Sequence, residues 1–174
     1  MNTQTLDFTP FQQLADDATL LILSITQPLE DGPAHDVLER VKQLFLAWHR
    51  DGKIRNASGA FYFERSFLVL AWEPTGATLS GCTRDQLTHL IQHLETELGF
   101  SLLSTPRFAV LTGERVTFMS QKEFRAKRQA GEITDHSPVF DHLIKTLGEF
   151  RGGKFMLPVV ESWYAPIGGK SSFS

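Results

Sequence analysis

The order of a few apolar patterns constrains the fold of this chain more than any single motif does. Between residues 18 and 112, two helical patterns alternate with short apolar runs of strand length. Residues 37–48 carry apolar side chains at i, i+4, i+7, i+8 and i+11, which is one face of a helix. Asp36 has the capping-box spacing of a helix start. The second helical face covers residues 87–98, and Gly99 is a typical stop.

The apolar runs around these helices read as strands. Residues 18–25 are apolar and are bounded by polar residues and a proline, which favours a buried strand. Residues 61–63 alternate and residues 67–72 form a second apolar run, so a hairpin is expected with its turn at 64–66. That turn contains neither glycine nor asparagine, which leaves its type open. Two further strands are expected within residues 107–119.

Strand, helix, strand, strand, helix, strand is the order of the split βαβ, ferredoxin-like arrangement. We therefore expect an α+β fold with an antiparallel sheet and both helices on one face, within a single domain of residues 1–174. An α+β sheet with another strand order is the main alternative. Residues 113–164 are expected to add an extension of two helices and a strand, and residues 165–174 a flexible tail.

The extension has its own boundary signals. Ser120 and the glutamate three residues later predict a helix that ends at Gly131. Ser137 before a proline predicts a second helix, which Gly148 would end. Pro158 confines the last extended segment to a sheet edge or a bulge.

Composition excludes several classes of function. An apolar content of 41% and a charged content of 21% are those of a globular protein. A net charge of -3 gives no general reason to bind nucleic acid or an anionic membrane. The single cysteine excludes an internal disulfide and a Cys-x-x-Cys zinc site, and no signal peptide is visible. We expect a cytoplasmic protein without cofactor or metal.

The cysteine lies at the start of the second helix, within Ser80-Gly81-Cys82-Thr83. Thr83 and the glutamine three residues on have capping-box spacing, which would place Cys82 just before the helix. Three interpretations stay open: a packed structural cysteine, a loop that binds a ligand or anion through free amides, and a nucleophile or redox sensor. The ligand-binding candidates are Ser80, Gly81, Cys82, Thr83 and Asp85.

Four stretches resemble a family of small bacterial proteins that is common in Bacteroidetes. They are "SGCTRDQLTHLIQHLETELGF", "EFRAKRQAGEIT", "VFDHLIKTLGEF" and "PVVESW", and the resemblance runs over about residues 48–163. The family pattern has Ser-Gly-Cys before a helix and Glu-Ser-Trp near the C-terminus. Its members often carry the automatic label "ABC transporter ATPase". The resemblance implies no established activity.

The ATPase label does not fit the residues. The closest stretch to a phosphate-binding loop is "GGKSS" at 168–172, but Tyr164 stands where the motif needs its first glycine. The sequence provides no helix after this stretch to hold a phosphate. We therefore expect the protein not to be an ABC ATPase.

A nucleophilic Cys82 would need a base. The resemblance draws attention to Trp48 and His49, although the family pattern is Trp-x-x-His-Gly and the histidine here is displaced. In the predicted fold we expect His49 and Cys82 to lie far apart, which disfavours a dyad. His89 and His93 have i, i+4 spacing that can bind metal, but a solvated face explains them better.

Glu161 and Trp163 form the second distinctive piece. A tryptophan in a C-terminal segment usually anchors that segment on an apolar surface, whereas a functional interpretation has the carboxylate facing a pocket.

The sequence favours a non-enzymatic cytoplasmic module that binds a small molecule or a protein partner. It could form a homodimer through an open sheet edge. The alternative is a thiol-dependent enzyme or redox sensor that uses Cys82.

Overall fold

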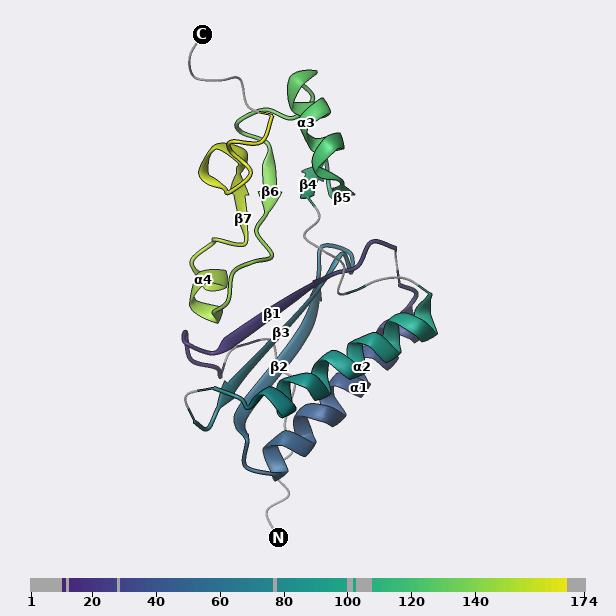
Figure 1. The fold of residues 1–174 in the computed structure, drawn as a ribbon, viewed down its shortest axis with the longest axis vertical. Helices are drawn as coiled ribbons and strands as arrows, with labels where there is room; N and C mark the ends of the chain where they lie inside the picture. Colours follow the sequence, from purple (N-terminus) through teal and green to yellow (C-terminus); the bar gives the residue numbers. More distant parts are fainter. Residues whose placement is uncertain are drawn as a thin grey trace.

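The computed structural model describes residues 11, 13–27, 29–76, 78–99, 102 and 108–168. Within these ranges the fold is α+β, with two antiparallel sheets and four α-helices (Figure 1). The expected α+β class is thus confirmed at this level.

The first sheet has three strands in the order β1-β3-β2: β1 (Thr19–Ser24), β3 (Phe67–Pro74) and β2 (Ile54–Tyr62). Helices α1 (Asp31–Arg50) and α2 (Gly81–Leu98) lie together on one of its faces (Figure 1). All pairs in this sheet are antiparallel, as the predicted hairpin requires.

The position of strand β3 between two apolar clusters explains why residues 67–72 are apolar without interruption. Leu68, Leu70 and the tryptophan at 72 face the cluster under the helices. Phe67 and Val69 face the opposite cluster, which the C-terminal half of the chain covers. The strand is therefore buried on both faces, a situation that gives a continuous rather than an alternating pattern.

Helix α1 begins at Asp31, so the predicted start at Asp36 is wrong by more than a turn. Pro33 lies in the first turn, where a missing N–H is tolerated because those donors have no helical partner. Ala34 is already buried against the core, so packing extends the helix backwards beyond the capping-box signal.

The second sheet has the order β5-β4-β6-β7. Its strands are β5 (Arg115–Met119), β4 (Phe108–Thr112), β6 (Pro138–Phe140) and β7 (Met156–Pro158). Helix α3 (Gln121–Gln129) starts at the predicted Ser120 cap, whose hydroxyl accepts a hydrogen bond from Glu123 N at 3.1 Å. The short helices α4 (Leu147–Arg151) and η1 (Val159–Glu161) complete this half.

The complete ferredoxin-like order is not present, because β4 does not join the first sheet. It pairs along its whole length with β5, its neighbour in sequence, from Phe108↔Met119 to Thr112↔Arg115. The outer edge of β1 pairs instead with the segment before α4. There Leu20 N donates to Lys145 O at 2.9 Å and Leu147 N donates to Ala18 O at 3.0 Å.

The helix predicted between Ser137 and Gly148 is also wrong, and with it the αα/strand form of the extension. Pro138 opens β6, and α4 begins only at Leu147. Val139 and Phe140 are both fully buried, in two different clusters, which a strand achieves because successive side chains point to opposite faces. The prediction for Pro158 is confirmed, since β7 is an edge strand.

The two sheets pack on each other through one apolar cluster. Phe67 and Val69 of β3 meet Ala109 of β4, Phe140 of β6 and Phe155 there. The predicted division at residue 112 therefore falls too late, because β4 already belongs to the second half.

Part of the predicted tail is packed. Ile167 N donates to Tyr164 O at 2.9 Å, and Gly168 lies so close to Arg125 of α3 that an added Cβ would be 2.9 Å from its Cα atom. Residues 169–174 lie outside the described residues, and with them most of the "GGKSS" stretch.

Candidate functional site

The Ser-Gly-Cys segment is a capped helix start, but the cap is Ser80 and not Thr83. The Ser80 hydroxyl accepts a hydrogen bond from Thr83 N at 3.2 Å and contacts the Thr83 hydroxyl at 2.9 Å. Helix α2 therefore begins at Gly81, and Cys82 lies inside the first turn. The position predicted for Cys82, just before the helix, is therefore wrong, because Ser80 and not Thr83 provides the capping bond.

Cys82 is exposed, so the packed interpretation of this cysteine is wrong. Gly81 and Asp85 are exposed as well, whereas Thr83 is buried. No described histidine is hydrogen-bonded to the thiol. The neighbours Leu79 and Arg84 line a cavity of about 180 Å³ beside Trp48 and Trp72, but the five predicted ligand-binding residues are not in its wall.

Trp48, at the end of α1, lies against the first half of α2, which removes the basis for the predicted separation of His49 and Cys82. Trp48 Nε1 donates to Gln86 Oε1 at 2.8 Å, and further along Arg40 pairs with Glu97 at 2.7 Å. The β2–β3 hairpin reverses the chain between the two helices, so they run antiparallel and these ends meet. Trp48 is a buried core residue, and the buried Nδ1 of His49 finds no hydrogen-bond partner among the described residues.

The C-terminal Glu161-Ser162-Trp163 piece acts as an anchor. Trp163 Nε1 donates to Asp141 Oδ1 at 3.2 Å, and its ring lies 5.3 Å from that of Phe108 and 4.4 Å from that of Tyr164. Glu161 is exposed at the end of η1. The anchor interpretation of the tryptophan fits this packing.

Tyr164 ties together two strands that share little direct pairing. Its buried hydroxyl donates to Phe140 O at 2.7 Å and accepts from Ala109 N at 3.1 Å. The only paired position between β4 and β6 is Val110↔Val139, so the phenol extends the ladder by side-chain bonds. Burial raises the pKa of Tyr164 to about 12, because the phenolate would be poorly solvated there.

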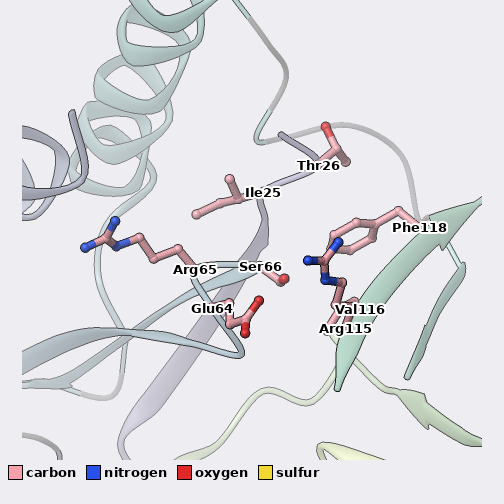
Figure 2. Close-up of a pocket in the computed structure, with 8 residues that line it drawn as sticks. All are labelled: Ile25, Thr26, Glu64, Arg65, Ser66, Arg115, Val116 and Phe118. Carbon is pink, nitrogen blue, oxygen red and sulfur yellow. The ribbon is translucent and has the colours of Figure 1, made fainter. Parts of the chain in front are cut away.

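The most convincing site lies where the two sheets meet. A cavity of about 270 Å³, here called the seam cavity, opens between the end of β1, the β2–β3 turn and the edge strand β5 (Figure 2). Its wall is formed by Ile25, Thr26, Glu64, Arg65, Ser66, Arg115, Val116 and Phe118.

The turn that borders the seam cavity is strained. Phe63, Glu64 and Arg65 have φ values of 52°, 53° and 65°, although none of them is glycine. Such left-handed residues each cost about 1–2 kcal/mol. Hydrogen bonds hold the turn: Ser66 N donates to Phe63 O at 3.0 Å, and Ile25 N donates to Ser66 O at 2.8 Å.

Packing fixes the turn further. The Phe63 ring lies 4.7 Å from that of Phe140, in the opposite sheet. The Arg65 guanidinium donates to Leu29 O at 3.0 Å and pairs with Asp31 at 2.6 Å. Arg65 therefore turns its charge away from the cavity, toward the start of α1 (Figure 2).

The remaining polar side chains of the seam cavity have no partner in the described part of the chain. Among the described residues, Arg115 and Glu64 form no ion pair, and the hydroxyls of Ser66 and Thr26 form no hydrogen bond. In the view of Figure 2, the Ser66 hydroxyl is drawn between the Glu64 carboxylate and the Arg115 guanidinium. The wall thus offers one cation, one anion and two hydroxyls beside an apolar surface.

A larger hollow of about 410 Å³ lies between α3 and the C-terminal segment. Its one arginine, Arg128, pairs with Asp135 at 2.8 Å, and its side chain is only 8% exposed. The pairing uses Nη2 of Arg128, whereas its buried Nε has no hydrogen-bond partner among the described residues. Because the charge already has a partner in Asp135, this hollow is the weaker candidate. Within the described residues, no three histidine, cysteine, aspartate or glutamate side chains gather in a way that could hold a metal ion.

No family model, curated protein or solved structure matches the chain. Within the described ranges, none of the helices combines the length and the apolar character needed to cross a bilayer.

The cavity residues were not among the candidates from the sequence. Thr26, Ser66 and Arg115 come from three segments that only the tertiary fold brings together. One signal was available: the expected turn at 64–66 lacks the residues that such turns prefer, and residues in unfavourable backbone conformations concentrate at functional sites.

Proposed function

We propose that this protein is a non-enzymatic binding module for a small organic ligand, which it holds in the seam cavity with an anionic group against Arg115. The observation that carries the proposal is a guanidinium without an ion-pair partner among the described residues, in one cavity wall with the hydroxyls of Ser66 and Thr26. A guanidinium matches a carboxylate or phosphate with two parallel hydrogen bonds.

The location supports this assignment. Ligand sites are frequent where two parts of a protein meet, and the seam cavity lies between the two sheets. Its volume of about 270 Å³ is near the lower end of the usual range for such pockets, roughly 300–1,000 Å³, which favours a small metabolite over a larger cofactor.

The wall also supports it. Val116 and Phe118 offer an apolar surface, and the Phe118 ring is held 5.6 Å from that of Phe67. The strained but well-bonded turn keeps Ser66 in place before a ligand arrives. A preorganised site loses less entropy on binding.

We thus assign the binding role to the seam cavity and not to the Ser-Gly-Cys segment. Two other expectations remain proposals beside it: membership of the bacterial family that the motifs resemble, and a cytoplasmic location. The exposed thiol of Cys82 fits a reducing compartment.

Calorimetric titration with 4-methylpentanoate, a small branched carboxylate, tests the proposed function. We expect Arg115→Gln to weaken binding about 10- to 100-fold, because a hydrogen bond to a charged group contributes about 1.5–3 kcal/mol. Arg50→Gln, at an exposed arginine near the end of α1, is the matched control and should bind like the parent. Equal affinities of the parent and the Arg115 variant, or no binding by the parent at millimolar concentration, would contradict the proposal.

A further inference from the structure

We infer that the ligand of the seam cavity is a zwitterion of the α-amino acid type, with its carboxylate at Arg115 and its ammonium group at Glu64. This inference rests on the proposed function and names the class of ligand. It starts from the fact that both charged residues line the same cavity.

The charges of Arg115 and Glu64 are both available at the cavity wall. Arg115 opens β5, and Glu64 stands at the tip of the β2–β3 turn, so they reach the cavity from different sheets. Within the described residues neither forms an ion pair, with the other or with a third group. Arg65, the neighbour of Glu64, is by contrast already paired with Asp31.

A purely anionic ligand would pair with Arg115 but not with Glu64. A carboxylate bound at Arg115 would also face the Glu64 carboxylate, and like charges in a partly enclosed site repel each other. An ammonium group on the same ligand converts that repulsion into attraction. Charge complementarity therefore selects a molecule that carries both signs.

The backbone at Glu64 gives an independent reason. Its φ of 53° lies in the left-handed region, where glycine or asparagine is accommodated at lower cost than glutamate. The Glu64 side chain is exposed and forms no hydrogen bond or ion pair in the described part of the chain. No such contact of the side chain therefore offsets the cost of the left-handed backbone. A role for its carboxylate in binding explains why a charged residue occupies this position.

The rest of the wall indicates the kind of side chain. Ile25, Val116 and Phe118 form its apolar part, and the hydroxyls of Thr26 and Ser66 can bond the polar head of the ligand. An aliphatic side chain of moderate size suits this surface.

Three matched probes test the inference on the intact chain: L-leucine, 4-methylpentanoate, which lacks the ammonium group, and 3-methylbutylamine, which lacks the carboxylate. We expect calorimetry at neutral pH to give leucine an affinity roughly five- to tenfold above that of 4-methylpentanoate, with the amine weakest. Glu64→Gln should abolish the preference for leucine and leave 4-methylpentanoate bound at least as well.

Glu114→Gln is the matched control, since Glu114 is exposed in the β4–β5 turn and does not line the seam cavity. Melting curves of the variants verify that each one folds. If leucine and 4-methylpentanoate bind equally and Glu64→Gln changes neither affinity, the inference is overturned while the proposed function stands. If no carboxylate binds the parent, both fail together.

Discussion

The helix-covered sheet and the second sheet are stabilised in different ways. Under the helices, a large apolar cluster fills the space, and Phe45, Trp48 and Trp72 make tilted and edge-on ring contacts there, with ring centres 5.3–6.2 Å apart. The second sheet has shorter strands and depends on Tyr164 and Trp163 of the C-terminal segment. The candidate site lies between the two, where polar side chains from both halves are unpaired among the residues that the structure describes.

The largest expected effect removes packing from the helix-covered half. Phe45 is fully buried, and Phe45→Ala should lower the free energy of unfolding by about 3–5 kcal/mol because it leaves a cavity in a close-packed core. Denaturant unfolding measures the change. A loss below about 1 kcal/mol would contradict the idea that this cluster dominates the stability of the half.

The second half should respond to alkaline pH. The raised pKa of Tyr164, about 12 against an ordinary value of 10.0, means that the folded state keeps its phenol proton more strongly than the unfolded state does. The resulting stability is present below pH 10 and is lost as the pH rises through 12, by about 2–3 kcal/mol in all.

Tyr164→Phe separates this effect from other alkaline changes. The variant should be less stable at neutral pH, because Ala109 N and Phe140 O lose their partner. It should also lose most of the dependence between pH 10 and pH 12 in denaturant titrations. A parent protein that is equally stable at both ends of that range would contradict the assignment.

A smaller effect is expected at the boundary between the halves. Glu64→Gly should raise the free energy of unfolding by about 0.5–1 kcal/mol, since relief of the left-handed conformation exceeds the added freedom of the unfolded chain. The variant should nevertheless lose the preference for leucine over 4-methylpentanoate. Glu64→Gln keeps the strain and removes only the charge, so thermal melting of this pair distinguishes the two contributions.

The smallest effect is expected at the start of α2. Cys82→Ser should change stability by no more than about 0.5 kcal/mol and leave ligand affinity unchanged, because the thiol is exposed and lies outside the wall of the seam cavity. The native thiol should react readily with an alkylating reagent at neutral pH. Slow alkylation would show that the thiol is protected and would contradict its exposure.

The difference between the halves also decides what the sequence could predict. Helices α1 and α2 and the β2–β3 hairpin have periodic apolar patterns, which depend on local geometry, and all of them exist. Their boundaries were less accurate, because Asp31 and Ser80 start their helices through packing and a capping bond that compete with equally good signals nearby.

The partner of β4 could not be predicted in this way. Phe108 to Thr112 read as a strand in either sheet, and only the competition between β5 and the edge of β1 decides. The same applies to Val139 and Phe140, which the Ser137-Pro138 signal placed in a helix but which the fold buries on two opposite faces of a strand. Pairing over long distances in the chain leaves little trace in one sequence.

The candidate site depends on such long-range placement, so pattern reasoning selected the Ser-Gly-Cys segment instead. That segment has a clear local signal, a cysteine at a capped helix start, whereas Glu64 and Arg115 carry no signal until the two sheets meet.

The most direct test is a map of amide chemical-shift changes in the ¹⁵N-labelled protein during titration with L-leucine. The central claim is that ligands bind at the seam cavity, so we predict the largest saturable changes at Ser66, Arg115 and Phe118, with little change at the start of α2. Changes concentrated at Gly81 and Cys82, with the amides of the seam cavity unaffected, would contradict it.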